Sequence, residues 1–340
     1  MMCQRGWPIL VFSLASTEGL PRSSLELVAA AEQLRDKLGD GIVQVALLGP
    51  DAESCAETLI HHGADEVFIA SNPELQSYKT EPILAVLEAA IKQLSPAVIL
   101  FPADVVGGEI APRLAYRLGA GIVTDCVGFE VDAESGHIRW LRPVYGGKAM
   151  AFMVARGPVQ IATFRQRAYE PLAEDTSRQG KIQALEVELE PAMAAHRSAG
   201  VSLVEEVREE IEGISLDEAE IVIGGGRGMG GPESFSELET LAQILQGAVG
   251  SSRPPADSGW VPHARLIGQT GKILGPDLYI AIGISGAPQH MAGISSAKTI
   301  VAINKDEDAP IFKVAHLGVV GDWRQVVPAL IRACRELVGG

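Results

Sequence analysis

The sequence contains few cysteines, and their spacing excludes the usual cysteine-based sites. Its four cysteines, Cys3, Cys55, Cys126 and Cys334, lie far apart, and no two of them form a CxxC pair. Neither a disulfide framework nor a zinc or iron–sulfur site is indicated. We therefore expect a reducing compartment, the cytoplasm.

Long hydrophobic runs are also missing. No segment approaches the roughly 20 apolar residues that a membrane-spanning helix needs. The apolar stretch at residues 7–15 is preceded only by Arg5 and runs into Glu18 rather than a small-residue cleavage site. We interpret this stretch as a first buried strand and not as a signal peptide.

Basic residues are outnumbered, with 28 lysines and arginines against 43 aspartates and glutamates and a formal net charge of −15. Nucleic acids and anionic membranes normally require a basic excess, so we expect neither as a partner. Acidic residues crowd one segment after residue 200, which we interpret as a solvated helix and connector rather than a metal or acid–base site. They are Glu205, Glu206, Glu209, Glu210, Glu212, Asp217, Glu218 and Glu220.

The sequence does have the length and composition of an ordinary globular protein. Its 340 residues are 47% hydrophobic and 21% charged, and this length favours two domains. We place the domain boundary near residue 200, which gives an N-terminal domain of residues 1–200 and a C-terminal domain of residues 201–340.

In the first half, short apolar strands alternate with amphipathic helices. We predict strands at residues 9–14, 42–48, 66–70 and 97–102, and helices at residues 23–38, 52–62, 82–94 and 109–118. Ser23 and Glu26 have the spacing of a capping box at the start of the first helix, and Gly39 is expected to end it. Fully apolar strands separated by helices indicate a parallel sheet covered on both faces.

The second half repeats this alternation. Strands are predicted at residues 221–224, 278–284, 299–304 and 318–321, and helices at residues 234–246 and 323–337. We therefore predict an α/β fold of two layered domains with mainly parallel sheets, the C-terminal one doubly wound and Rossmann-like.

A glycine-rich turn follows the strand at residues 221–224. Gly226, Gly228 and Gly231 match the pattern GxGxxG, which allows a backbone to approach a pyrophosphate. Glycines after a strand often serve tight packing alone, so both interpretations stay open. Arg227 favours nucleotide binding, because a guanidinium in a neutral loop has a natural partner in phosphate oxygens.

Three further polar clusters lie on loops: residues 250–257, residues 267–272 and residues 285–292. In a doubly wound sheet the loops at the carboxyl ends of the strands form the binding crevice, where Asn304 and Asp322 are also expected. Ordinary polar turns, and a packing role for His290, remain alternatives. A Ser/His hydrolase is disfavoured because residues 283–287 read GISGA, without the final glycine of GxSxG.

Together these clusters resemble the α subunit of the electron transfer flavoproteins. The matching motifs are GGRG at residues 225–228, GSSR at 250–253, GQTGK at 268–272, LYIAIGISGAPQH at 278–290, KTIVAINKD at 298–306 and APIF at 309–312. The first half is similar less sharply, at residues 21–27, 111–117 and 142–150. The resemblance thus covers nearly the whole chain.

The resemblance implies a heterodimer of α and β subunits that contains FAD and carries electrons without converting a substrate of its own. The FAD would lie mainly on the C-terminal domain, and the N-terminal domain would pack against the β subunit. Electrons would come from acyl-CoA dehydrogenases of fatty acid β-oxidation or other flavin dehydrogenases, and would pass singly to a downstream oxidoreductase. Some members of the family hold a second FAD and bifurcate electrons from NADH, and no residue here decides that question.

The resemblance also implies roles for single residues. Arg227 would contact the pyrophosphate, Asp322 and Trp323 would lie near the adenosine, and Thr270 would offer its hydroxyl near flavin N5. Arg253 by the isoalloxazine and His290 at its N1/O2 edge would tune the reduction potential. The full cofactor-binding set is Arg227, Ser252, Arg253, Ile267, Gly268, Gln269, Thr270, Ser285, Gly286, Ala287, Pro288, Gln289, His290, Asn304, Asp322 and Trp323.

The sequence departs from the family pattern at four positions. Pro254 and Pro255 replace small residues and are expected to stiffen the loop of Arg253, while His263 and Leu266 replace polar residues before GQTGK. These departures bear on the exact flavin potential rather than on binding.

Two alternative functions remain to be weighed. An NAD-dependent Rossmann dehydrogenase would need an acidic residue about 20 positions after the glycine turn, where the chain has Ser252 and Arg253 instead. A non-redox nucleotide-binding scaffold is the other alternative. The loop from Asp104 to Gly108 lacks the lysine of a phosphate loop, so we interpret that loop as structural.

Overall fold

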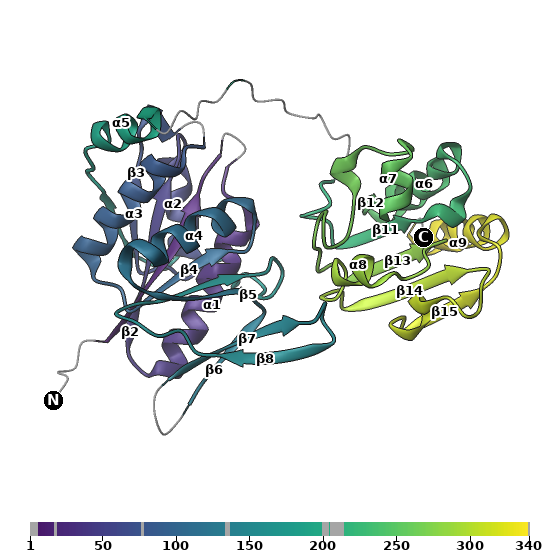
Figure 1. Ribbon diagram of the computed structural model, residues 1–340, viewed down its shortest axis with the longest axis horizontal. Helices are drawn as coiled ribbons and strands as arrows, with labels where there is room; N and C mark the ends of the chain where they lie inside the picture. The colour runs from purple at the N-terminus through teal and green to yellow at the C-terminus, as the bar shows by residue number, and fades with distance from the viewer. Residues whose placement is uncertain are drawn as a thin grey trace. The chain divides into compact units, whose positions relative to one another are not determined.

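The computed structural model describes residues 6–16, 19–75, 78–132, 137–198, 204 and 214–338. The chain divides into two compact units (Figure 1). The N-terminal unit comprises Met1–Val144 with Met150–Val207, and the C-terminal unit comprises Tyr145–Ala149 with Arg208–Gly340. The predicted fold class, layered α/β with mainly parallel sheets, is confirmed. The predicted boundary near residue 200 falls beside residues outside the described ranges.

The N-terminal unit is built on a parallel sheet of seven strands in the order β10-β3-β2-β1-β4-β9-β5. The strands are β1 (Trp7–Leu14), β2 (Gly41–Leu48), β3 (Glu66–Ala70), β4 (Val98–Pro102), β5 (Gly121–Cys126), β9 (Gln160–Phe164) and β10 (Lys181–Ala184). The central strands are apolar throughout because two separate hydrophobic clusters cover the two faces of the sheet.

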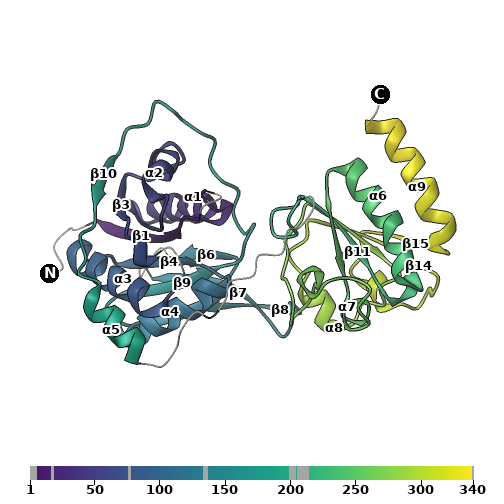
Figure 2. The same cartoon turned by 90° about the horizontal axis from the view of Figure 1, so that it is seen from above.

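Helices on both faces of the sheet supply those two layers, as Figure 2 shows. One face is covered by α1 (Arg22–Leu38) and α2 (Ala52–His61). The other is covered by α3 (Thr80–Leu94) and α4 (Val105–Leu118), and α5 (Glu190–Ser198) packs against α3. No helix in the described ranges is both long and apolar enough to cross a membrane.

The predicted capping box at the start of α1 is wrong. Pro21 occupies the N-cap, and no side chain caps the helix. Glu26 instead accepts hydrogen bonds from Nε of Arg22 at 3.0 Å and from the backbone N–H of Arg167 at 2.7 Å, a residue far along the chain. The contact with Arg167 therefore occupies the Glu26 carboxylate, which the predicted capping box would have used at the start of the helix. The predicted end is confirmed, because Gly39 has a φ of 81°.

Asp104 caps α4, as the structural interpretation of its loop predicts. The Asp104 carboxylate accepts a hydrogen bond of 2.7 Å from the backbone N–H of Gly107. Gly107 itself lies against the carbonyl oxygen of Pro102, where a Cβ atom would come within 1.9 Å. The glycine is thus needed for close packing of α4 on β4.

A smaller antiparallel sheet, which the sequence did not predict, consists of β6 (Gly128–Val131), β7 (Ile138–Val144) and β8 (Ala149–Met153). Phe129 and Trp140 from this sheet are buried in the larger core. Their rings meet those of Phe164 and Tyr169 at centroid distances of 5.9–6.4 Å. This aromatic cluster anchors the small sheet to the N-terminal unit.

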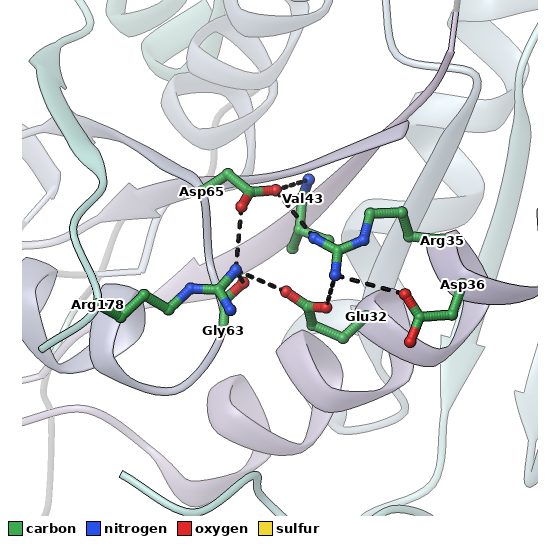
Figure 3. A network of polar contacts seen from close by, with 7 residues as sticks. All are labelled: Glu32, Arg35, Asp36, Val43, Gly63, Asp65 and Arg178. Atoms are coloured by element: carbon green, nitrogen blue, oxygen red, sulfur yellow. Dashed lines mark hydrogen bonds and ion pairs between the residues drawn. The ribbon is translucent and has the colours of Figure 1, made fainter. Parts of the chain in front are cut away.

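A network of charged side chains fastens the segment before β10 to the unit (Figure 3). Arg178 donates to Glu32 of α1 at 2.8 Å, to Asp65 at 3.0 Å and to the carbonyl oxygen of Gly63 at 2.6 Å. Arg35 bonds the other oxygen of Glu32, so this nearly buried carboxylate is held between two guanidinium groups. Burial raises the pKa of Glu32, and the two arginines act against that rise.

The C-terminal unit is a parallel sheet of five strands in the order β12-β11-β13-β14-β15. The strands are β11 (Ile221–Gly225), β12 (Ala248–Ser251), β13 (Leu278–Ile282), β14 (Thr299–Asn304) and β15 (Leu317–Val320). Numbered along the chain their order is 2-1-3-4-5, which is a doubly wound topology. The main helices α6 (Phe235–Leu245) and α9 (Trp323–Val338) pack together on one face (Figure 2).

The structure describes only part of the acidic segment after residue 200. Glu205, Glu206, Glu209, Glu210 and Glu212 lie outside the described residues. Asp217 forms an ion pair with Lys272, which belongs to the GQTGK motif. In the described ranges, no group of three or more histidines, cysteines or acidic residues could hold a metal ion.

Candidate functional site

The predicted site residues follow the carboxyl ends of the five parallel strands in the C-terminal unit. Arg227 follows β11, Ser252 follows β12, Ser285 follows β13, Asn304 ends β14 and Asp322 follows β15. All five strands are parallel, so these ends share one edge of the sheet. The chain runs from β11 to β12 on one side and then crosses to β13 on the other, which makes β11 and β13 the switch point where such sheets bind ligands.

The glycine-rich turn after β11 packs tightly against the end of β13. The N–H of Gly228 donates to the carbonyl oxygen of Gly283 at 3.0 Å, and a Cβ atom on Gly226 would lie 2.1 Å from that same oxygen. Packing alone therefore accounts for two glycines of the GxGxxG pattern. The partner, Gly283, has a φ of 63° and was not predicted as part of the site.

Arg227 lies at the tip of this turn with its side chain exposed. Among the residues that the structure describes, none forms a hydrogen bond or an ion pair with its guanidinium. Short 3₁₀ turns, Arg227–Met229 and Pro232–Ser234, separate the glycines from α6. The helix predicted at residues 234–246 is confirmed as α6 (Phe235–Leu245), and Arg227 supplies a positive charge in the turn before it.

The loop after β12 carries two serines and Arg253. Ser251 is fully buried, and its hydroxyl has no hydrogen-bond partner among the described residues. Ser252 is fixed by a hydrogen bond of 3.0 Å from its N–H to the carbonyl oxygen of Gly225. Arg253 begins the short helix α7 (Arg253–Asp257) and forms an ion pair of 3.1 Å with Asp257. Both side chains are at least half exposed, so this pair is weak and Arg253 can leave it for another anion.

Pro254 and Pro255 occupy the first turn of α7. Proline is well tolerated there, because the first backbone N–H groups of a helix have no partner within it. The two prolines therefore fit the helix that positions Arg253, and the expected stiffening of this loop has a structural basis.

The GQTGK turn is held between β12 and α8 (Pro288–Ala292). Ile267 donates its N–H to the carbonyl oxygen of Ser251 at 2.9 Å, and Gln269 donates to that of Gln289 at 2.8 Å. Gly268 has a φ of 148°, where a side chain would be strained. Gln269 and Thr270 are exposed at the tip. Their backbone is fixed, so their side chains are offered to a ligand in a defined place.

His263 and Leu266, two of the residues that differ from the family pattern, lie just before the GQTGK turn. The N–H of Leu266 donates to the carbonyl oxygen of His263 at 3.0 Å, in the short turn His263–Arg265. Leu266 is buried in the core of the unit, whereas His263 is exposed. The apolar residue at position 266 thus contributes to packing.

The loop after β13 presents several residues of the predicted set. Ser285, Ala287, Pro288 and Gln289 are exposed, while Gly286 is buried. Gly286 has a φ of 83°, and a Cβ atom there would lie 2.3 Å from the backbone nitrogen of Ile311. This close approach fixes the loop and leaves Ser285 and Gln289 at its surface.

His290 is buried, and protein groups engage both of its ring nitrogens. Nδ1 lies 3.0 Å from the carbonyl oxygen of Ile267, and Nε2 lies 2.9 Å from the hydroxyl of Tyr279 on β13. A carbonyl can only accept, so Nδ1 must carry the proton and the Tyr279 hydroxyl must donate to Nε2. Burial lowers the pKa of His290 to about 4, with a smaller opposing effect of the bond to Ile267. The imidazole is therefore neutral near pH 7.

The sequence did not single out Tyr279 as the partner of His290. Its signal was a tyrosine inside the otherwise apolar strand LYIAI, since a buried tyrosine hydroxyl usually has a hydrogen-bond partner. Burial raises the pKa of Tyr279, which keeps the phenol protonated as a donor. Because His290 has no free nitrogen, it does not form a catalytic pair with Ser285, and a hydrolase is not supported.

Two further predicted residues, Asn304 and Asp322, have hydrogen bonds of their own, whereas Trp323 has a donor without a partner in the described ranges. The amide of Asn304 donates to the carbonyl oxygen of Ile284 at 2.9 Å and accepts from the N–H of Asp306 at 3.0 Å. Asp322 accepts a 2.9 Å bond from the N–H of Arg324 at the start of α9. Trp323 has a buried indole N–H that lacks a partner among the described residues.

The edge of the sheet thus gathers donors that the protein does not use itself. Within the described ranges, no hydrogen bond or ion pair occupies the side chains of Arg227, Gln269, Thr270, Ser285 and Gln289. Two arginines, several polar tips and closely packed backbone turns are suited to an anionic ligand with a polar heterocycle. The fold and the site together define a doubly wound α/β domain that binds a nucleotide-type cofactor.

Comparison with known proteins names the family. Residues 9–190 match the model of the electron transfer flavoprotein domain, and residues 215–295 match that of the electron transfer flavoprotein FAD-binding domain. The chain belongs to the electron transfer flavoprotein family, as an α subunit. Electron transfer and FAD binding follow from this membership, and the unoccupied donors, the two arginines and the orphaned Ser251 hydroxyl fit such a cofactor.

The curated relatives match over nearly the full length. The electron transfer flavoprotein subunit alpha of Bacillus subtilis is 38% identical, covering 98% of each chain. That of Thermoanaerobacterium thermosaccharolyticum is 39% identical, covering 97% of this chain and 98% of the relative. Protein FixB of Clostridium saccharobutylicum is 37% identical, covering 97% of each.

Proposed function

We propose that this chain carries FAD in a cytoplasmic heterodimer with a β subunit, takes electrons from flavin dehydrogenases and passes them singly to a downstream oxidoreductase. Acyl-CoA dehydrogenases of fatty acid oxidation are the first candidates for the donor. The observation that carries the proposal is the set of fixed loops with unoccupied donors at the switch point of the C-terminal unit.

We assign the predicted residues to different parts of the cofactor. Arg227, whose guanidinium is exposed, binds the pyrophosphate. Asp322 and Trp323 lie at the adenosine end, where the indole N–H of Trp323 is a donor without a partner. Arg253 and Thr270 face the isoalloxazine. Ser252, Gln269, Ser285 and Gln289 supply further hydrogen bonds, and Asn304 holds the ends of β13 and β14 together.

The remaining members of the predicted set act through the backbone. Ile267, Gly268, Gly286, Ala287 and Pro288 belong to turns whose hydrogen bonds and close packing place the donors beside them. These turns also limit the access of water, because Ile267 and Gly286 are buried. A preorganised set of donors gains affinity by avoiding an ordering cost on binding.

Bound FAD supplies one-electron and two-electron redox chemistry that amino-acid side chains lack. Arg253 and His290 adjust its potential. Arg253 is exposed and always charged, so it can place a positive charge beside added electron density. His290 can donate from Nε2 only after its tautomer changes or it gains a proton, and in either case Nε2 no longer accepts the present bond from Tyr279.

We assign contact with the β subunit to the domain of residues 1–200 and FAD binding to the domain of residues 201–340. Whether the assembled protein holds one or two FAD molecules decides between a simple carrier and a bifurcating one.

Co-expression of the chain with its β subunit, followed by purification and an absorption spectrum, tests the proposal. A yellow heterodimer whose flavin is bleached by a flavin dehydrogenase and its substrate is the expected result. A pair that associates but stays colourless when FAD is added would contradict it. Quenching of protein fluorescence by NAD without any flavin would favour the dehydrogenase alternative instead.

A further inference from the structure

The hydroxyl of Tyr279 is enclosed between α8 and the strand β11. Tyr279 belongs to β13, and its side chain is fully buried. On one side the hydroxyl donates to Nε2 of His290 at 2.9 Å. On the other side it lies against β11, the neighbouring strand, where a Cβ atom on Gly224 would come within 1.9 Å of the hydroxyl oxygen. The position of the phenol therefore depends on a glycine that is not part of the GxGxxG pattern.

The imidazole that receives this bond is fixed from its other side as well. Nδ1 of His290 donates to the carbonyl oxygen of Ile267 at 3.0 Å, and the N–H of Ile267 donates to the carbonyl oxygen of Ser251 at 2.9 Å. The backbone N–H of His290 donates to the carbonyl oxygen of Ala287 at 2.9 Å. The ring therefore cannot turn without leaving a buried polar group unpartnered.

Tyr279 and the assigned role of His290 need the same nitrogen in opposite states. A neutral imidazole has one donor nitrogen and one acceptor nitrogen. Because Nδ1 donates to Ile267, Nε2 has a lone pair, and the phenol occupies it. A donor to the flavin edge must instead carry a proton on Nε2. The phenol stabilises the imidazole without that proton, so it opposes the donating state.

Charged groups are nearly missing from the elements packed around His290. The strands β11 and β13 and the helix α8 contain no lysine, arginine, aspartate or glutamate, and Lys272 of the GQTGK turn is paired with Asp217. Burial lowers the pKa of His290, and the bond to Ile267 acts against that effect. Removing the phenol therefore changes the proton affinity of the imidazole without changing any charge beside it.

We infer that Tyr279 is a positioning residue that keeps Nε2 of His290 occupied and unprotonated, and that it thereby holds the potential of the bound flavin lower than His290 would set it without the phenol. Gly224 contributes by leaving room for the hydroxyl. Tyr279 acts through His290, because its own side chain is fully buried. The inference rests on the proposed function, since it assumes FAD beside His290.

The first measurement follows the proton on His290 in the heterodimer after FAD has been removed. NMR of 15N-labelled histidine rings against pH gives the tautomer and the pKa, and His290→Gln identifies the signal by its loss. The wild type should show a neutral ring protonated on Nδ1 at about pH 7. In Tyr279→Phe the neutral ring loses a donor, so the pKa of His290 should rise by at least about one unit.

Redox titration of the FAD-loaded heterodimer is the second measurement. Tyr279→Phe should favour uptake of the first electron about tenfold, which is a rise of about 59 mV. His290→Ala should lower the potential, and opposite signs are not expected from a core that is merely loosened. In the background of His290→Ala, Tyr279→Phe should have no effect, because the residue through which it acts is gone.

Tyr169→Phe is the matched control, because it removes a phenol from the N-terminal unit. It should change neither the pKa of His290 nor the potential. Urea unfolding checks that both variants are folded. A wild-type ring protonated on Nε2 would overturn the inference whatever the variants do. So would a potential that is unchanged or lower in Tyr279→Phe, or a rise that is equal with and without His290.

The wild type separates this inference from the proposed function. If the wild-type pair retains no flavin, the proposed function fails, and the inference fails with it. If the pair is yellow and Tyr279→Phe has the wild-type potential, only the role of Tyr279 fails.

Discussion

The hydroxyl of Tyr279 donates a hydrogen bond of 2.9 Å to Nε2 of His290, and both side chains are buried. This contact ties β13 to α8, and Nδ1 of the same imidazole ties α8 to the GQTGK turn through the carbonyl oxygen of Ile267. A single neutral histidine thus connects β13 with two segments that carry predicted flavin ligands, α8 and the GQTGK turn. Its protonation state should therefore affect both the stability and the redox behaviour of the protein.

Stability should fall in mild acid because of His290. Its pKa is about 4 in the folded protein and about 6.5 when unfolded, so below pH 6.5 the unfolded state binds the proton first. The contribution of this group is fully present above about pH 6.5 and is lost as the pH falls toward 4, by on the order of 3 kcal/mol.

Urea unfolding at about pH 7 and about pH 5 measures this effect. His290→Gln is the matched variant, because its amide can accept from Tyr279 and donate to Ile267 without titrating. The wild type should lose more stability than the variant between the two pH values. Equal losses would show that another group causes the acid sensitivity.

The one-electron potential of the bound flavin should fall in His290→Ala while FAD remains bound. His290 would donate to the N1/O2 edge once Nε2 carries a proton in place of accepting from Tyr279. Loss of that donor removes roughly 1.5–3 kcal/mol of stabilisation of the added charge, which corresponds to on the order of 100 mV. Redox titration of the heterodimer measures the change. His137→Ala, which alters an exposed histidine of the N-terminal unit, is the control, and an unchanged potential in His290→Ala would count against the assigned role.

Arg227→Ala should weaken retention of FAD without destabilising the fold. The side chain is exposed and has no partner within the described part of the chain, so its removal costs the protein nothing, whereas the cofactor loses a charged hydrogen bond. We expect at least about a tenfold increase in the dissociation constant. Dialysis followed by flavin absorbance tests this. Arg332→Ala on α9 serves as the control for an exposed arginine, and equal retention in the two variants would contradict the assignment.

Arg178→Ala should destabilise the N-terminal unit by about 1–3 kcal/mol, because it leaves Glu32 nearly buried with one of its two guanidinium partners removed. Burial already raises the pKa of Glu32, and loss of Arg178 raises that pKa further. The loss of stability should therefore be largest at neutral pH and shrink as the carboxyl is protonated in acid.

Thermal unfolding of Arg178→Ala at two pH values measures this, with Arg113→Ala as control. Arg113 pairs with Glu109 on the surface at 3.2 Å, and its side chain is 53% exposed, so its loss should have little effect. A similar small change in both variants would show that the network around Glu32 is not needed for stability.

Much of the fold could be predicted because the central strands are buried on both faces and read as continuous apolar runs. The strands from β1 to β4 and the helices from α1 to α4 lie close to their predicted ranges. Strands β5 to β10 were missed because they carry polar residues or lie at sheet edges, as β8 and β10 do. No helical or alternating pattern marks such strands.

The position of the site could be predicted, but the hydrogen bonds between its residues could not. Loops at the carboxyl ends of parallel strands must meet, so the clusters around Arg227, Ser252 and Ser285 were expected to share one edge. The contacts of His290 depend on which side of α8 faces the core, and a sequence pattern does not show that for a helix of five residues. The capping box failed for a related reason, since Arg167 takes the carboxylate of Glu26.

The absorption spectrum of the purified heterodimer, recorded after FAD is added and excess removed, tests the central claim most directly. The account predicts a flavin spectrum that stays with the protein and decreases when Arg227 is replaced by alanine. A wild-type pair that is folded and associated but retains no flavin would contradict it.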